Sequence, residues 1–184
     1  MKLAIVVGHN QVAQGAVRPD TGETEYVWNL DLARMIVEEA VAFPAIEVGV
    51  FKRQPGGGYT HEIRTVYREV DAWDADGSCE LHFNSHTNRQ ATGTEVLSSG
   101  SAQSLAFAGA MQERLIDALD LRDRGVKIRR SGRGSESLMS GQAPAILIEP
   151  FFGSSPNGQQ ATNEPHEKRA IARAVLLAAK DAFL

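Results

Sequence analysis

The chain has 184 residues, of which 42% are apolar and 23% charged, and this composition is typical of one globular domain spanning 1–184. Its formal net charge of −4 gives no support to a nucleic-acid partner, because phosphate binding needs concentrated positive charge. The single cysteine excludes an internal disulfide and any zinc site built from several cysteines.

The N-terminal segment reads as a first strand. Residues 3–8, LAIVVG, form a continuous apolar run, which is typical of a strand covered on both faces. The segment has neither the long apolar region nor the cleavage site of a signal peptide. No apolar run approaches the roughly 20 residues of a membrane helix. We therefore expect synthesis in the cytoplasm without membrane insertion, with any export by another route.

The next segments alternate between helix and strand. Residues 25–43 have helical periodicity, and Thr24 is placed to cap this helix, with Glu25 in its first turn. The apolar positions of its expected face are Leu30, Ala33, Ile36, Val37, Ala40 and Val41. A strand is predicted in 46–53. A second helix is predicted from Thr60, with one apolar face formed by Ile63, Val66, Tyr67 and Val70.

The second half continues the alternation. Strands are predicted in 78–84, 92–99 and 143–152, the last of them ended by its proline, Pro150, and helices in 101–121 and 164–184. The basic run 122–133 reads as a solvated loop, with contact to an anionic substrate as the alternative. The order predicts an α/β fold: a single domain with a twisted, mostly parallel sheet of about five to six strands and helices on both faces.

Two polar residues stand at strand ends, where functional groups gather in such sheets. His9 follows the first strand directly after Gly8. Glu149 ends the apolar run AILIE, where a carboxylate is costly unless it is paired, bound to a metal or exposed at a cleft. For His9, a bond to a loop carbonyl is the simpler alternative.

The segment 78–88, SCELHFNSHTN, holds further possible metal ligands. Side chains alternate along a strand, so Cys79 and His82 point to opposite faces, and Cys79 reads as a small core residue. His82 and His86 share a face but lie roughly 13 Å apart along a strand. That separation is too large for one zinc ion with bonds of about 2.0–2.1 Å. At most one of the two histidines is therefore expected to be a ligand.

His9, Glu25 and one of these histidines make a set of two imidazoles and one carboxylate. This set is common for a catalytic zinc ion that keeps a fourth position open. Glu149 is then a free carboxylate, available as a general base.

The motif order resembles the zinc-dependent N-acetylmuramoyl-L-alanine amidases of the amidase-3 type, found in bacterial cell-wall hydrolases and phage endolysins. The resemblance runs from about residue 2 to residue 152, and the final helix is consistent with it. The matching segments are Gly8-His9, GETEYVWNLDLA at 22–33, ELHFN at 80–84, TGTEVL at 92–97, RGVK at 124–127 and PAILIEPFF at 144–152.

The resemblance assigns the metal ligands. His9 matches the first ligand, after a strand and a glycine. Glu25 matches the second, since Asn29-Leu30 follow at the required spacing, whereas Glu23 does not fit and reads as a solvated loop carboxylate. His82 matches the third better than His86 does, because a longer loop then precedes Gly93-Thr94-Glu95.

Glu149 matches the catalytic glutamate of this family. Three departures stand beside these matches. Asn10-Gln11 replace glycines, and Pro150-Phe151-Phe152 replace the more usual Gly-Phe. Glu80 replaces a serine; it shares a face with His82 and is either its hydrogen-bond partner or, as we favour here, a solvent-facing carboxylate. Asn84 either orients a ligand or contacts the glycan, or is a plain strand-end asparagine.

The resemblance implies one Zn²⁺ ion and hydrolysis of the amide between N-acetylmuramic acid and L-alanine, with peptidoglycan or a muropeptide as substrate. We expect a monomer with no separate wall-binding domain. An endolysin-like enzyme would act on the wall after release during phage or prophage lysis, and a cytoplasmic muropeptide-recycling amidase is the competing context. The segments 54–59 and 131–141 are candidates to cover the site.

Two rival functions remain. The first is another zinc amidohydrolase, such as a carboxypeptidase-like enzyme, which needs an arginine that binds a carboxylate in its cleft. Arg53, Arg64 and Arg133 are candidates, although each reads more simply as a surface charge. The second is a catalytically inactive wall-binding homologue. The intact set of His9, Glu25, His82 and Glu149 argues against it.

Overall fold

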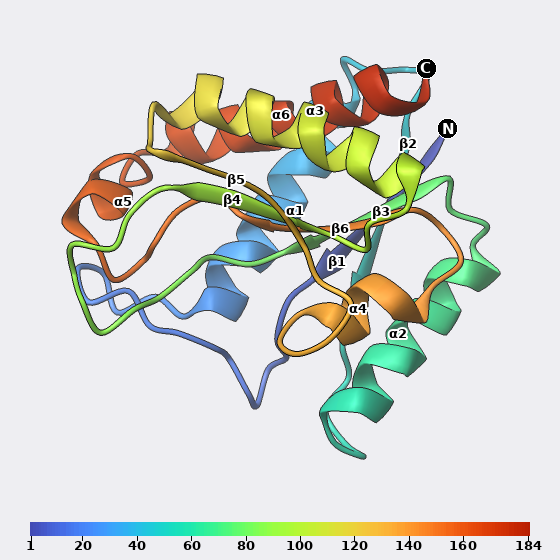
Figure 1. Ribbon diagram of the computed structural model, residues 1–184, viewed down its shortest axis with the longest axis horizontal. Helices are drawn as coiled ribbons and strands as arrows, with labels where there is room; N and C mark the ends of the chain where they lie inside the picture. The colour runs from blue at the N-terminus through green and yellow to red at the C-terminus, as the bar shows by residue number, and fades with distance from the viewer.

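The computed structural model describes all residues from Met1 to Leu184 and forms one six-stranded sheet with helices on both faces (Figure 1). The strands are β1 (Lys2–Val7), β2 (Glu47–Lys52), β3 (Gly77–Leu81), β4 (Thr94–Ser98), β5 (Asp123–Ile128) and β6 (Ala145–Glu149). The helices are α1 (Glu25–Ala40), α2 (Tyr59–Ala72), α3 (Ala102–Leu119), α4 (Ser135–Ser140), α5 (Pro156–Gln160) and α6 (Pro165–Phe183). The predicted α/β class and mostly parallel sheet are confirmed.

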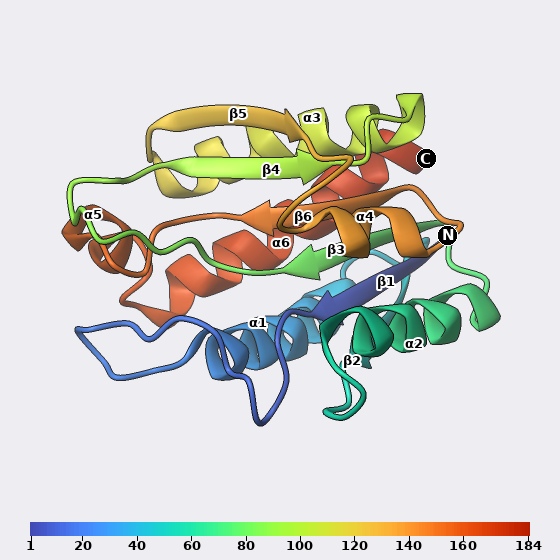
Figure 2. The same cartoon turned by 60° about the horizontal axis from the view of Figure 1, so that its bottom comes forward.

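The sheet has the order β2-β1-β3-β6-β4-β5, which Figure 2 shows from β5 at the top to β2 at the bottom. The first four of these strands run parallel, whereas β4 pairs antiparallel with β6 and parallel with β5. The carboxyl ends of β1, β3 and β6 therefore meet at one edge, and β4 begins at that edge. In open α/β sheets this is the edge at which ligands bind.

The two faces of the sheet are covered by different helices. In Figure 1, α3 and α6 lie on one side of the sheet and α2 and α4 on the other. α1 packs against α6, and α2 packs against α4, so the layers are α1/α3/α6 and α2/α4. None of the helices is long and apolar enough to cross a membrane.

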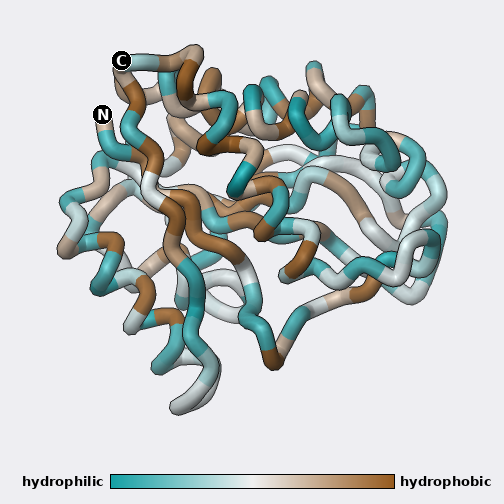
Figure 3. The backbone as a smooth tube through the Cα atoms, turned by 180° about the vertical axis from the view of Figure 1, so that it is seen from behind, coloured by the Kyte–Doolittle hydropathy of each residue, from teal (hydrophilic) through white to brown (hydrophobic).

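β1 shows why a continuous apolar run is needed at the centre of the sheet. Leu3, Ile5 and Val7 belong to the large core under α1, α3 and α6, whereas Ala4 and Val6 pack against α2. Alternate residues of a strand point to opposite faces, so both sets are buried. Figure 3 shows the apolar colouring concentrated on the strands inside the molecule.

α1 begins as predicted, but its buried face matches the predicted one only in part, through Ala33 and Ile36. The Thr24 side chain accepts a hydrogen bond from the backbone N–H of Val27, which caps the helix and fixes Glu25 as its first residue. The core positions are Trp28, Asn29, Leu32, Ala33, Met35 and Ile36. Leu30, Val37 and Val41 of the expected face are exposed, because α1 turns its Trp28 and Leu32 stripe toward the sheet and α6.

The prediction that 122–133 is a loop is wrong for its first half. Residues 123–128 form β5, an edge strand that pairs with β4. The charged residues mask the strand signal, because an edge strand has no neighbour beyond it and tolerates polar side chains. The short helices α4 and α5 were also not expected from the sequence. The apolar face of α2, with Ile63, Val66, Tyr67 and Val70, is buried as predicted.

Candidate functional site

Four polar side chains meet at the edge where β1, β3 and β6 end. His9 lies two residues beyond β1, His82 follows β3 directly, and Glu149 is the last residue of β6. Glu25 is the first residue of α1, which brings its carboxylate to the same edge. The parallel pairing of β1 with β3, and of β3 with β6, therefore assembles residues that are far apart in the sequence.

His9, Glu25 and His82 form a compact cluster. Glu25 Oε2 lies 3.1 Å from His9 Nε2, and Glu25 Oε1 lies 2.7 Å from His82 Nδ1. Each of the three residues offers one ligand atom, and these atoms lie within 4.8 Å of one another. Two imidazole nitrogens and a carboxylate oxygen are a donor set that suits Zn²⁺. The three residues therefore fit a single metal ion.

The pKa shifts in the cluster favour an ionised Glu25 carboxylate between His9 and His82. Burial alone raises the pKa of a carboxyl, but hydrogen bonds from His82 and His9 hold the pKa of Glu25 well below its ordinary value. Burial alone lowers the pKa of a histidine, but Glu25 and Glu80 hold the pKa of His82 well above its ordinary value. The site thus attracts positive charge to the point between these side chains.

Two glycines leave the space that the cluster needs. A Cβ added to Gly15, whose φ is +78°, would lie 2.6 Å from His9 Nε2 and 2.7 Å from Glu25 Oε2. A Cβ added to Gly8 would lie 2.3 Å from the Leu81 carbonyl oxygen and 2.6 Å from the His82 ring. His9 itself has φ +67°, a left-handed conformation that turns the chain sharply after β1.

Glu80 contacts the ring nitrogen of His82 that does not contact Glu25. Its Oε1 lies 2.9 Å from His82 Nε2, and its Oε2 accepts a hydrogen bond of 3.0 Å from the Tyr67 hydroxyl. Burial alone raises the pKa of Glu80, but the hydrogen bond that its carboxylate accepts from His82 keeps this pKa below its ordinary value. The preference for a solvent-facing Glu80 is therefore wrong: the side chain is buried, because β3 is a central strand and α2 covers that face.

Glu149 lies in the same cleft and is chemically distinct from Glu25. Its Oε2 is buried and has no hydrogen-bond partner. Burial raises the pKa of Glu149 to about 8. A carboxyl group with a pKa near neutrality is suited to accept and return a proton. Its neighbour across the antiparallel pair is Glu95, whose carboxylate accepts hydrogen bonds from Asn84 and Arg124.

These side chains line a cleft of about 680 Å³. Its wall also includes Asn10, Ala13, Gly15, Ala16, Arg53, Tyr59, Glu62, Phe83, Asn84, Ser85, Glu95, Leu97, Arg129, Arg133, Gly134 and Leu147. A cavity of this size holds a small-molecule or peptide ligand. The segments 54–59 and 131–141 each contribute to this wall, through Tyr59 and through Arg133 and Gly134.

Other residues considered from the sequence lie outside the cluster. His86 is exposed; its backbone N–H donates to Ser154 Oγ, and its Nδ1 accepts from the backbone N–H of Asn88. Cys79 is buried in the large core, as predicted. Glu23 is partly exposed and lines a separate small pocket.

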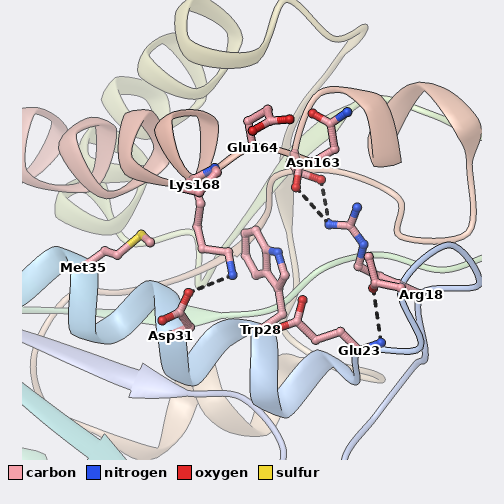
Figure 4. A pocket seen from close by; sticks show the side chains of 11 residues that line it. Arg18, Glu23, Trp28, Asp31, Met35, Asn163, Glu164 and Lys168 are labelled. Atoms are coloured by element: carbon pink, nitrogen blue, oxygen red, sulfur yellow. Dashed lines mark hydrogen bonds and ion pairs between the residues drawn. The ribbon is translucent and has the colours of Figure 1, made fainter.

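That separate pocket, of about 150 Å³, lies between α1 and the start of α6 (Figure 4). Lys168 Nζ lies 3.0 Å from Asp31 Oδ2 and 4.8 Å from the centre of the Trp28 ring. The buried Arg18 guanidinium donates to Thr162 and pairs with Asp20 at 2.8 Å. The basic side chains that line this pocket, Arg18 and Lys168, are paired with acids, so the pocket reads as a polar contact between α1 and the start of α6.

The arginines named from the sequence divide into two groups. Arg53 and Arg133 line the cleft, whereas Arg64 pairs with Glu136 at 2.7 Å on the surface. The expectation that Arg53 is a surface charge is wrong, since it is 5% exposed. Sequence reasoning did not assign Gly15 or the Tyr67 hydroxyl to the site, and it considered Arg129 only as part of the basic run 122–133. The glycine has no local signal, but a tyrosine on the sheet-facing side of α2 signals a buried hydroxyl that needs a partner.

Solved structures share this fold. The catalytic domain of CwlV, an N-acetylmuramoyl-L-alanine amidase from Bacillus (Paenibacillus) polymyxa var. colistinus, aligns with a TM-score of 0.82 at 20% identity, over 98% of this chain and 97% of that chain. An N-acetylmuramoyl-L-alanine amidase from Clostridium difficile 630 aligns with a TM-score of 0.83 at 21% identity, over 97% and 94%. The catalytic domain of the CD27L endolysin, which targets Clostridia difficile, gives 0.79 at 26% identity, over 96% and 97%.

A comparison with curated protein sequences gives no match. The family model described as N-acetylmuramoyl-L-alanine amidase, in contrast, matches residues 3–181, which is nearly the whole chain. The matched range contains the histidines and glutamates of the site and all six strands apart from Lys2, the first residue of β1. The chain therefore belongs to the N-acetylmuramoyl-L-alanine amidase family, which is the family that its sequence motifs resemble.

Proposed function

We propose that the chain is a zinc-dependent hydrolase that cleaves the amide between the lactyl group of N-acetylmuramic acid and the L-alanine of the stem peptide. Membership of the amidase family carries the reaction class. The observation that carries the mechanism is the placement of Glu149 in the same cleft as the cluster of His9, Glu25 and His82.

His9, Glu25 and His82 would hold the zinc ion. When bound, zinc would supply a Lewis acid that polarises the scissile carbonyl. The chain keeps the three donors in place by different means: the left-handed turn at His9, the start of α1 at Glu25, and the Glu80 carboxylate behind His82. Support of a ligand histidine by a carboxylate fixes its ring and its tautomer.

Glu149 moves the proton. Its carboxylate accepts a proton from the attacking water and returns it to the amine of L-alanine as the amide bond breaks. The unpartnered Oε2 leaves this group free of any competing hydrogen bond within the chain. In the metal-free chain, burial raises the pKa of Glu149 to about 8. The same burial would favour the protonated carboxyl between the two proton transfers.

The biological setting we propose is endolysin-like lysis of the cell wall. The likeness to the CD27L catalytic domain, of which 97% is covered at 26% identity, supports this setting. A recycling amidase would use the same chemistry on soluble muropeptides. Intact peptidoglycan sacculi and soluble muropeptides, offered in parallel, separate the two settings by which substrate is cleaved faster.

The function is tested with purified muropeptides in the presence and absence of a chelator, for the wild type and for Glu149→Ala. We expect new L-alanine amino groups without new reducing sugar ends, and loss of this release with chelator or with the variant. Zinc added after the chelator is removed should restore the activity of the wild type but should not give activity to Glu149→Ala. Release that resists chelation, or a fully active Glu149→Ala, would refute the mechanism. Release of C-terminal amino acids instead would support a carboxypeptidase-like enzyme.

A further inference from the structure

Three arginines line the cleft, one from the end of β2 and two from the connection between β5 and α4. Arg53 directly follows β2, Arg129 directly follows β5, and Arg133 lies just before α4. All three line the cleft that contains His9, His82 and Glu149. We call this set of Arg53, Arg129 and Arg133 the arginine wall.

The carboxylates around the arginine wall already have partners within the chain. Glu25 lies between two histidines. Glu62 accepts a hydrogen bond of 2.8 Å from Asn10 and another of 2.9 Å from a backbone N–H. Glu95 pairs with Arg124 at 2.8 Å. Glu149 is the one acid without a partner, and proton transfer accounts for it. The acids of the cleft therefore do not neutralise the whole arginine wall.

The arginines, in contrast, keep unused donors. Arg129 and Arg133 are exposed to the cleft, and neither makes an ion pair or a side-chain hydrogen bond within the chain. Arg53 is 5% exposed; its Nη2 lies 3.4 Å from Glu62 Oε2, and its guanidinium lies 5.2 Å from the Tyr59 ring centre. Its Nε is buried without a partner. Such donors suit a planar anion that accepts two hydrogen bonds.

We propose that the arginine wall binds a carboxylate of the stem peptide and thereby selects acidic stems. This inference rests on the proposed amidase function, which places the scissile amide beside Glu149. The stem continues from L-alanine into a D-glutamyl residue, whose α-carboxylate is the first anion beyond that amide. The arginine wall binds this carboxylate, so amidation of the stem at that position weakens binding.

The test uses three soluble muropeptides with the stem L-Ala–γ-D-Glu–L-Lys. One has both carboxylates free, one has the glutamyl α-carboxylate amidated, and one has the C-terminal carboxylate amidated. We expect wild-type protein to cleave the first and third with similar kcat/KM and the second about tenfold more slowly. Arg129→Gln and Arg133→Gln should raise KM for the first and third by about fivefold to tenfold, with little change in kcat or in the cleavage of the second.

Arg130→Gln is the matched control, because Arg130 is exposed in the same segment but does not line the cleft. It should leave all three substrates unchanged. Equal effects of Arg129→Gln and Arg133→Gln on all three muropeptides, or no effect, would overturn the inference. If the muropeptide with the amidated C-terminal carboxylate is the one cleaved more slowly, the assignment to the glutamyl carboxylate is overturned.

A binding measurement tests this inference independently of the proposed amidase activity. Isothermal titration of the same muropeptides into Glu149→Gln requires no hydrolysis, and adding Arg133→Gln to that variant removes part of the arginine wall. Tighter binding of the free α-carboxylate, lost in the double variant, supports the inference even if no muropeptide is cleaved. Equal binding of free and amidated stems contradicts it even if the wild type proves to be an active amidase.

Discussion

Glu80 Oε1 lies 2.9 Å from Nε2 of His82, while Glu25 contacts Nδ1 of the same ring at 2.7 Å. Nδ1 of His82 thus lies beside Glu25, which we propose as a second zinc ligand, and Nε2 is held by the buried carboxylate of Glu80. This arrangement makes Glu80 a positioning residue, because it acts on the ligand and lines no part of the cleft.

Glu80→Gln should therefore weaken zinc binding by about 10- to 100-fold while the chain stays folded. The amide is nearly the same size but lacks the charge that fixes the tautomer of His82. Competition with a chromophoric chelator measures the affinity, and circular dichroism checks the fold. Glu113→Gln on the exposed side of α3 is the control. Unchanged zinc affinity would contradict the positioning role.

Gly15→Ala should abolish zinc binding, since the added Cβ falls 2.6 Å from His9 Nε2. Gly22→Ala is a matched control, because Gly22 also has a positive φ, of +74°, and nothing lies within 4 Å of its Cβ position. Both variants should lose about 1 kcal/mol of stability from backbone strain. Only Gly15→Ala should lose the metal, as measured by metal analysis after dialysis. Equal metal content in the two variants would show that Gly15 is not needed for space.

His82→Ala should lose bound zinc, whereas His86→Ala should retain it. His82 lies in the cluster, and His86 is exposed and bonded within its own loop. Metal content per chain after loading and dialysis measures the difference. The reverse result would show that the ligand lies four residues further along the chain than we propose.

Glu149→Gln should stabilise the metal-free protein at high pH and not at low pH. The pKa of Glu149 is raised from 4.5 to about 8, so the folded state favours the protonated form. Its contribution to stability is fully present below the unfolded pKa of 4.5 and is lost as the pH rises through about 8. Urea unfolding in chelator at pH 5 and pH 9 tests this. Equal effects of the substitution at both pH values would contradict the raised pKa.

The sequence was sufficient to place His9 and Glu149 just after or at strand ends, because both follow buried apolar runs. The end of β3 was predicted less well: β3 ends at Leu81, and the predicted strand ran to residue 84. It could not predict the role of Glu80, since alternation along β3 gives the face of a side chain but not what covers that face. α2 covers it and supplies the Tyr67 hydroxyl. The choice of His82 over His86 came from the family resemblance, and the structure places only His82 beside Glu25.

The arginine wall was only partly accessible to sequence reasoning, for a related reason. Arg129 and Arg133 lie in a run whose charge reads as solvated loop, and β5 was missed there. Arg53 was expected on the surface, although packing between α2 and β2 buries it. Such placements depend on which helix packs on which face, and periodicity alone does not contain that information.

The pairing of Val7 with Leu81 has a consequence for the order of folding and zinc binding. His9 and His82 lie just beyond these two residues, so an unfolded chain offers the ion no more than scattered single ligands. The large apolar core is built from other side chains and does not include the cluster. Folding can therefore precede loading, and zinc should act afterwards as a ligand whose concentration raises the melting temperature by mass action.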